Sequence, residues 1–281
     1  MYAFELSGLC KTYKTFRLKN INLTLPKGCI MGLIGENGAG KSTTIRLMLD
    51  IIEKDSGTIK ILGKDMDKNP VEIKNDIGVV LDEPCFSLLL KATEINKIMK
   101  HTYTKWDEEE FFRLLEKFGI DPKKKVKAYS KGMKMKLSIA VALSHKAKLL
   151  VLDEPTGGLD PVIRNEIVDI FYEFTRNPEN SVLISSHIVS DLEKLCDYIA
   201  FIHKGELILC EEKDRLLDRY GIIRCTADEI KEISADAIKS KKVSPYGVEA
   251  IVERNKIPAS FEISPIGIED FFVSVIRGIE V

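Results

Sequence analysis

Several features are missing from this sequence of 281 residues, and each absence excludes a class of protein. No apolar run approaches the roughly 18 residues that a membrane-spanning helix requires. The first five residues, MYAFE, do not place a basic region before an apolar one, which argues against a signal peptide. Neither sign of charge is in excess, because 42 Lys and Arg balance 43 Asp and Glu. The overall charge therefore does not indicate a nucleic-acid or membrane-surface binder.

Paired cysteines are also missing. The six cysteines, at positions 10, 29, 85, 196, 210 and 225, form no C-x-x-C pair. This argues against a zinc site or a disulfide framework and favours a reducing compartment, so we expect a cytosolic protein. A hydrophobic content of 44% and a charged content of 30% are ordinary for a globular chain. The length suits one large core, or one domain with a small appendage.

The most informative stretch present is GENGAGKST, residues 35–43, which has the form G-x-x-x-x-G-K-S. The apolar run before it, residues 29–34, has the length of a strand. Apolar side chains at helical spacing follow it over residues 43–52. A strand, a glycine-rich loop and a helix form the context that this motif requires, so we interpret it as a phosphate-binding loop.

The residue types explain the chemistry of this loop. Glycines let backbone N–H groups converge on phosphate oxygens, and the helix that follows adds the positive end of its dipole. Lys41 is expected to reach the β- and γ-phosphates, and the Ser42 hydroxyl to ligate Mg²⁺. We therefore predict that the chain binds a nucleoside triphosphate. The predicted binding residues in the loop are Gly35, Glu36, Asn37, Gly38, Ala39, Gly40, Lys41, Ser42 and Thr43.

Strands alternate with helices along the first 220 residues, which predicts an α/β domain with a largely parallel sheet. A helical pattern occupies residues 84–145, and Asp160 followed by proline predicts another helix start. Residues 221–281 have a weaker pattern and predict a small appended α+β unit. The expected strands cover residues 2–9, 16–25, 29–34, 58–62, 77–81, 149–152, 181–185 and 198–202.

Two carboxylates follow the apolar run at residues 149–152. Asp153, at the end of this strand, can meet the Mg²⁺ held by Ser42. Glu154 is placed to polarise a water molecule for in-line attack on the γ-phosphate. A strand that simply ends in acidic residues is the structural alternative, but the phosphate-binding loop upstream favours the catalytic interpretation.

In combination with four further stretches, residues 1–220 resemble the ATP-binding cassette of an ABC transporter. Tyr13 matches the aromatic residue that stacks on adenine in that family. The sequence YSKGM at 129–133 occupies the place of the family's signature sequence. Asp160 lies in a stretch similar to the loop that links the two sites across the dimer. His187 resembles the switch histidine that contacts the γ-phosphate.

The resemblance implies a P-loop NTPase cassette with a mostly parallel sheet, an antiparallel β subdomain and a helical subdomain. It implies ATP and Mg²⁺ as ligands and a second cassette, identical or not, as partner. Ser130 and Gly132 would then touch the γ-phosphate held by that partner. The membrane-spanning permease would be a separate chain, in contact with the helical stretch 84–128. The cassette would work in the cytoplasm, peripheral to the inner face of the membrane.

Three positions depart from the family's usual pattern, and one of them is Met133, where the signature usually has Gln. Asp82 stands where the family usually has Gln, and we hypothesise that it keeps the metal-binding role as a hard oxygen donor. In the signature, Lys131 replaces the usual Gly. Its side chain either adds a positive charge facing the nucleotide or points to solvent. The predicted catalytic residues are thus Lys41, Asp82, Glu154 and His187, and the predicted metal ligands are Ser42, Asp82 and Asp153.

Seven lysines lie between residues 123 and 136. They are interpreted as a solvated face that favours approach to the partner's nucleotide, with a DNA- or lipid-binding patch as the alternative. His101, His145 and His203 show no ligand spacing, so no role is assigned to them.

The leading function is the ATPase subunit of a transporter, most similar to cassettes of ABC-2-type exporters through residues 129–133 and 268–272. The competing class is a cytosolic cassette protein that acts on nucleic acid or ribosomes. Those relatives usually carry two cassettes or a long coiled coil, and this chain shows neither, so no nucleic-acid partner is expected. A catalytically dead regulatory cassette is the third interpretation. The residues Lys41, Asp153, Glu154 and His187 argue against it.

Overall fold

Five parallel strands form the centre of the structure, a computed structural model that describes residues 1–82 and 86–279. A sixth strand joins one edge in the antiparallel direction, giving the spatial order β10-β9-β3-β8-β7-β6. The central strands are buried on both faces, which is why they read as continuous apolar runs. The six strands are β3 (Ile30–Ile34), β6 (Ile77–Val80), β7 (Leu149–Asp153), β8 (Ser181–Ser186), β9 (Tyr198–His203) and β10 (Glu206–Glu212).

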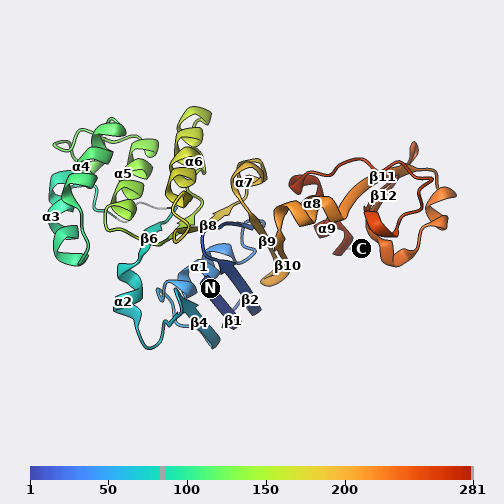
Figure 1. Cartoon of the computed structure of the whole chain (residues 1–281), viewed down its shortest axis with the longest axis horizontal. Coiled ribbons are helices and arrows are strands. Elements are labelled where there is room, and N and C mark those ends of the chain that lie inside the picture. The colour runs from blue at the N-terminus through green and yellow to red at the C-terminus, as the bar shows by residue number, and fades with distance from the viewer. Residues whose placement is uncertain (83–85, 280–281) are drawn as a thin grey trace.

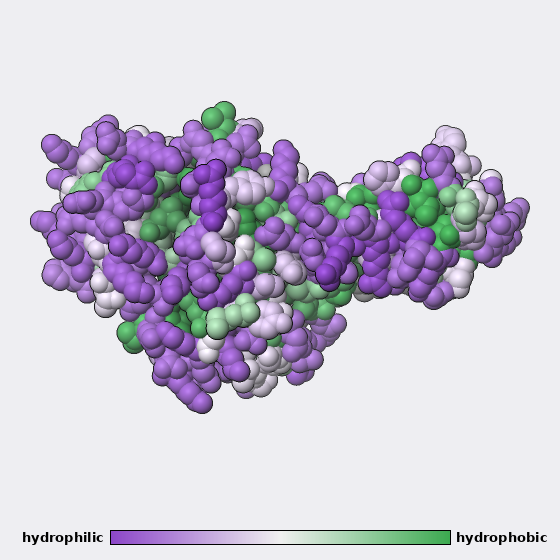
Figure 2. All heavy atoms as spheres, in the orientation of Figure 1, coloured by the Kyte–Doolittle hydropathy of each residue, from purple (hydrophilic) through white to green (hydrophobic). Residues whose placement is uncertain are grey.

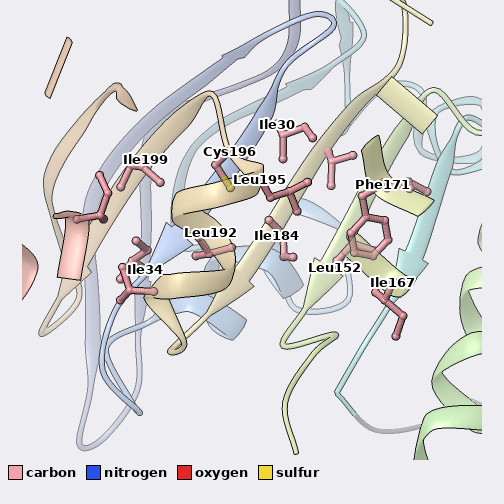
Figure 3. Packing of buried hydrophobic residues seen from close by; sticks show 14 of the residues in the cluster. Ile30, Ile34, Leu152, Ile167, Phe171, Ile184, Leu192, Leu195, Cys196 and Ile199 are labelled. Carbon is pink, nitrogen blue, oxygen red and sulfur yellow. The ribbon is translucent and has the colours of Figure 1, made fainter. Parts of the chain in front are cut away.

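Short helices cover this sheet. On one face, Leu192 and Leu195 of α7 pack against Ile30, Ile184 and Ile199 of the strands (Figure 3). On this side the core also takes in the buried apolar residues of the longest helix, α6. Among the helices that pack on the sheet are α1 (Lys41–Met48), α6 (Pro161–Thr175) and α7 (Val189–Leu195). Because the strands are parallel, all their carboxyl ends meet at one edge, where ligands bind in folds of this kind.

The helix after the phosphate-binding loop is shorter than the spacing of apolar residues predicts. It ends at Met48, whereas the pattern extends to Ile52. Asp50 adopts a left-handed conformation with φ of 54°. Its N–H bonds to the carbonyl of Leu47, and the N–H of Ile51 bonds to that of Arg46. This Schellman-type arrangement satisfies the last carbonyls and stops the helix, although apolar residues continue.

An antiparallel sheet lies beside the central one, in the order β2-β1-β4-β5. In this sheet, β2 buries Ile21, Leu23 and Leu25 and exposes the residues between them, as the alternation of apolar and polar residues predicts. These side chains share a core with Leu33 of β3 and Ile45 of α1. The four strands are β1 (Tyr2–Thr12), β2 (Arg17–Pro26), β4 (Ser56–Ile61) and β5 (Lys64–Asp65).

Helices between β6 and β7 form a separate subdomain with its own core. Phe111, Leu114 and Leu115 of α4 are buried in it and form one apolar face of that helix. Asp107 caps the helix by accepting a hydrogen bond from the N–H of Glu110. The predicted start of this subdomain, near residue 84, lies outside the described residues. Its helices are α3 (Ala92–Thr102), α4 (Glu108–Lys117) and α5 (Lys131–Leu143), while α2 (Pro70–Asn75) precedes β6.

The last part of the chain extends to one side of the cassette (Figure 1). The antiparallel sheet β11-β13-β12 forms it, and the final helix returns towards the cassette, where Phe271 and Phe272 stack on Phe201 of β9. The fold class is thus confirmed, but residues 206–219 form a strand and a helix that sequence patterns did not predict. The unpredicted strand is β10 and the unpredicted helix is α8 (Lys213–Arg219). The elements that follow them are β11 (Tyr220–Cys225), β12 (Ile238–Ser244), β13 (Gly247–Glu253) and α9 (Ile268–Ile279).

Hydrophilic side chains cover most of the face shown in Figure 2, and hydrophobic ones form several separate patches, one of which lies over the C-terminal unit. No helix in the described part of the chain is both long and apolar enough to cross a membrane.

His145 joins the helical subdomain to the central sheet. Its ring is buried and stacks on Tyr103, with ring centroids 4.0 Å apart. One ring nitrogen lies 3.1 Å from the carbonyl oxygen of Val141 in α5, and the other lies 3.0 Å from that of Ile77 in β6. A neutral imidazole has one N–H, so only the charged ring would donate to both carbonyls. Burial nevertheless lowers the pKa of His145, because it penalises the charged form.

This lowered pKa makes the stability of the fold depend on pH. The unfolded chain binds the proton of His145 more tightly, so the free energy of unfolding falls as pH drops below the unfolded value of about 6.5. We expect His145→Gln to lessen this loss between about pH 7.5 and 5, measured by urea unfolding. His101→Gln, at an exposed histidine of the same subdomain, is the control and should keep the wild-type slope. An unchanged slope in His145→Gln would contradict the assignment.

Candidate functional site

A pocket of about 750 Å³ lies at the carboxyl edge of the central sheet. Its walls come from the loop after β3, the ends of β6, β7 and β8, and the start of α5. Most of the side chains predicted from sequence for catalysis and nucleotide binding line it together. The lining residues are Thr15, Phe16, Glu36, Asn37, Gly38, Gly40, Lys41, Ser42, Thr43, Asp82, Lys131, Glu154, Gly157, Gly158 and His187.

The loop between β3 and α1 brings the first turn of α1 to the wall of this pocket, and the first N–H groups of a helix have no partner within it. Gly40 begins α1 with φ of 119°, a conformation that L residues rarely adopt, and supplies no capping side chain. The first turn of the helix contains no acidic residue either. At Gly35, a Cβ atom would lie 2.4 Å from the carbonyl oxygen of Ile202, so only glycine fits there. The free N–H groups and the helix dipole make the loop an anion-binding site.

Lys41 extends its side chain back over this loop and is only 5% exposed. Its ammonium donates to the carbonyl oxygens of Gly35 at 2.7 Å and Glu36 at 3.3 Å. Glu154 Oε1 lies 3.3 Å from the same nitrogen, so a carboxylate balances the buried charge. The predicted lysine of the loop and the predicted general base are therefore in direct contact.

Glu154 also contacts the predicted switch histidine. Its Oε2 lies 2.7 Å from His187 Nδ1 and 3.3 Å from the His187 backbone nitrogen. Glu154 has φ of 51°, and its N–H is held by the carbonyl and the hydroxyl of Ser185. The backbone thus turns sharply after β7 and aims the carboxylate into the pocket between Lys41 and His187.

Asp153 lies behind this carboxylate and does not line the pocket. It is buried, and its Oδ1 accepts a hydrogen bond from the Ser185 hydroxyl at 2.5 Å. Ser185 therefore links the two carboxylate-bearing residues, since its oxygen also accepts from the N–H of Glu154 at 3.1 Å. Of the predicted metal ligands, Ser42 and Asp82 face the pocket and Asp153 stands in the layer beneath it.

The signature stretch begins α5 at the side of the pocket. Ser130 caps the helix by accepting a hydrogen bond from the N–H of Met133, and Gly132 lets Ile163 of α6 approach closely. Neither residue lines the pocket, but Lys131 does. The Lys131 ammonium would lie 2.8 Å from a Cβ atom built on Gly158, so it rests against that turn. Asp160, also outside the lining, caps α6 as predicted.

The predicted adenine-stacking residue lies at the rim of the site. Tyr13 is 44% exposed and is not among the lining residues, although Lys11 approaches its ring at 5.8 Å. Phe16 and Thr15 line the pocket, and sequence reasoning missed both. The Tyr13 N–H bonds to the Phe16 carbonyl at 2.7 Å, so one tight turn carries all these residues. The spacing Tyr-x-x-Phe was the only sequence signal for Phe16.

Residues 18–157 match the ABC transporter family. The chain is 38% identical over 213 residues to the lantibiotic transport ATP-binding protein SrtF of Streptococcus pyogenes, an alignment that covers 75% of this chain and 91% of that protein. It is also 39% identical over 207 residues to the bacitracin transport ATP-binding protein BcrA of Bacillus licheniformis, covering 73% of this chain and 68% of that protein.

Solved structures agree with these sequence relatives. The ATP-binding subunit of an ABC transporter superposes with a TM-score of 0.70 at 27% identity, over 76% of this chain and 91% of that one. A dimeric ATP-binding cassette in a post-hydrolysis state, bound to ADP and Pi, gives a TM-score of 0.68 over 75% of this chain and 98% of that one. Its identity of 22% supports the fold alone. The phosphate-binding loop, the paired carboxylates and these relatives lead to one conclusion: the chain belongs to the ABC transporter family, as an ATP-binding cassette.

Proposed function

We propose that this chain binds and hydrolyses ATP to power an exporter, as one of two cassettes attached to separate membrane subunits. One observation carries the proposal: Lys41, Glu154 and His187 form a single contact network beside the phosphate-binding loop. A lysine for the phosphates, a carboxylate for the attacking water and a histidine for the γ-phosphate are the groups that phosphoryl transfer to water requires.

The mechanism follows from the contacts of these three residues. ATP phosphates enter the loop, accept hydrogen bonds from its free N–H groups and offer Lys41 an anion in place of the carbonyls of Gly35 and Glu36. Glu154 then loses its contact with the Lys41 ammonium and can accept a proton from water. His187, anchored on the other carboxylate oxygen, is placed to donate to the γ-phosphate. The sharp turn after β7 keeps Glu154 in line with the loop throughout.

Mg²⁺ fits the donor groups of this site. Ser42 and Asp82 at the pocket wall, with Asp153 beneath, offer the hard oxygen ligands that this ion prefers. Within residues 1–82 and 86–279, no three His, Cys, Asp or Glu side chains gather into a metal cage. Mg²⁺ usually binds through one or two carboxylates plus substrate phosphates, so such a cage is not required. When bound, the ion would neutralise charge that develops on the phosphates.

The second cassette would complete the site. Ser130 and Gly132 stand at the start of α5, outside this chain's own pocket, where a partner's nucleotide can reach them. Asp160 begins α6 beside them and would link the two sites. Lys131 lines the pocket, which supports the interpretation that its charge faces the nucleotide. We place the end of the cassette near residue 220, where the separate sheet of the C-terminal unit begins.

The names of the relatives support a cargo class. SrtF is named for lantibiotic transport and BcrA for bacitracin transport. We therefore propose that the exporter moves peptide antibiotics and that this cassette works at the inner face of the cell membrane. Binding and closure of two cassettes around ATP, followed by opening after hydrolysis, would drive the membrane subunits.

Replacing the proposed general base tests the proposal directly. Glu154→Gln keeps the size of the side chain and one accepting oxygen but cannot take a proton from water, so turnover should fall by at least about 100-fold. ATP binding should persist, and light scattering after size exclusion should show a dimer only with Mg²⁺ and ATP. Glu109→Gln, on the exposed face of α4, is the matched control with wild-type turnover. Normal hydrolysis by Glu154→Gln would remove Glu154 from the mechanism.

Asp82 is tested by its effect on Mg²⁺. Asp82→Ala should raise the Mg²⁺ concentration needed for half-maximal phosphate release and lower the maximal rate, because one hard oxygen ligand is lost. Asp228→Ala, at an exposed carboxylate of the C-terminal unit, should change neither quantity. If Asp82→Ala retained both the wild-type Mg²⁺ dependence and the wild-type rate, the metal role of Asp82 would be wrong.

The position of adenine is tested at the rim of the pocket. Stacking of a base on an aromatic side chain contributes about 1–3 kcal/mol, so Tyr13→Ala should weaken ATP binding by about 5- to 150-fold. Tyr13→Phe, which keeps the ring, should bind ATP like the wild type in a fluorescent-nucleotide displacement assay. If Phe16→Ala weakens binding and Tyr13→Ala does not, the base stacks on Phe16 instead.

A further inference from the structure

His203 is a buried histidine that the proposed mechanism does not use. It is the last residue of β9, its side chain is only 3% exposed, and neither ring nitrogen has a hydrogen-bond partner in the described part of the chain. A buried polar group without a partner costs free energy, and most buried polar groups in folded proteins have one. The ring therefore calls for an explanation.

The turn that follows His203 is bonded to the phosphate-binding loop. Gly205 donates its N–H to the carbonyl of Ala39 at 2.9 Å, and its own carbonyl accepts from the N–H of Lys19 at 2.7 Å. The residue before His203, Ile202, presses its carbonyl oxygen against Gly35. The imidazole is thus fixed in position relative to the loop.

The nearest charged atom belongs to that loop. Glu36 Oε2 lies 3.5 Å from His203 Nδ1, just beyond hydrogen-bonding distance. Glu36 is half-exposed and lines the pocket that is proposed to take the triphosphate. Its carboxylate would repel a nucleotide there unless its charge were balanced or moved away.

The other charged groups near His203 do not replace Glu36 as the partner of its ring. Glu206 of β10 is the residue paired with His203 in the antiparallel register, and it forms an ion pair with Lys19 of β2 at 2.6 Å. The hydrogen bond from Lys19 is the main reason that the pKa of Glu206 is lowered, and the charge of His203 contributes less. Lys204, the next residue along the chain, is the charged residue of the turn between β9 and β10. For Glu36, no ion pair other than that with His203 is found among residues 1–82 and 86–279.

We propose that His203 is a positioning residue for nucleotide binding, whose imidazolium closes onto Glu36, neutralises it and holds it back from the phosphates. This inference rests on the proposed function of the pocket. The short gap closes through a change in the Glu36 side chain, because the imidazole itself is buried and held between the loop and β10. Nucleotide affinity then depends on the protonation of His203, and it is higher when the ring is charged.

A double-mutant cycle separates this role from a structural one. Isothermal titration calorimetry with Mg²⁺ and a non-hydrolysable ATP analogue would be run on the full chain at about pH 6 and about pH 8, on either side of the usual histidine pKa. The set comprises wild type, His203→Gln, Glu36→Gln and the double variant. At the lower pH, His203→Gln should weaken binding about two- to fivefold, the range for a partly exposed ion pair. At the higher pH the difference should shrink, because the wild-type ring is then neutral.

The effect of His203→Gln on nucleotide affinity should depend on whether residue 36 carries a charge. In the Glu36→Gln background, His203→Gln should have no effect at either pH, and Glu36→Gln alone should bind more tightly than wild type at the higher pH. Glu206→Gln removes the same charge from the other side of the ring, outside the pocket, and should leave affinity at the higher pH unchanged. The protonation of the nucleotide itself is common to all variants and cancels in their ratios. The proposal would be overturned if His203→Gln had the same effect with and without the Glu36 carboxylate, or the same effect at both pH values.

A second measurement covers the case in which His203→Gln does not fold. NMR titration of the His203 ring should give a lower pKa in Glu36→Gln than in wild type, and equal values would overturn the pairing.

The two proposals fail in different ways. If wild type binds no analogue at all, the proposed function is wrong, and the positioning role is wrong with it. If wild type binds and the cycle shows no coupling, only the role of His203 is wrong.

Discussion

The buried ammonium of Lys41 is the constraint on which the site depends. A charge that is 5% exposed must find compensating partners, and here two loop carbonyls and one carboxylate supply them. That carboxylate comes from a residue far along the chain, directly after β7. Lys41 and Glu154 meet only because β3 and β7 both flank β8 in the parallel sheet and end at the same edge. The ion pair between Lys41 and Glu154 thus requires this order of strands in the sheet.

The same argument explains why the resting contacts suit catalysis. A phosphate can replace the two carbonyl partners of Lys41, because carbonyl oxygens are weaker partners for an ammonium than an anion is. Glu154 is held from both sides, by Lys41 and His187, and sits on a backbone turn with positive φ. A strained turn of this type is retained where the surrounding structure fixes it. Here Ser185 provides that support, through its bonds to Glu154 and Asp153.

The sequence predicted the elements of the cassette better than it predicted the arrangement of the pocket. Short motifs such as GENGAGKST imply their local geometry, because glycine positions and strand ends determine where N–H groups and carboxylates point. The end of α1 at Met48 escaped prediction, since a Schellman-type cap at Asp50 leaves no mark in the apolar pattern. Phe16 escaped, and the two alternatives for Lys131 stayed open, for a different reason: their place in the pocket depends on how separate subdomains meet, which no local spacing contains.

His203 shows the same limit most clearly. Read along the chain, it is an isolated histidine without ligand spacing, and no role follows from that. The sheet order places β9 directly beside β3, so the end of β9 must meet the loop that leaves β3. The ring of His203, at that point, comes within 3.5 Å of the Glu36 carboxylate of the phosphate-binding loop. A buried ring next to a carboxylate that faces the proposed nucleotide site is therefore a consequence of topology, which a linear motif cannot express.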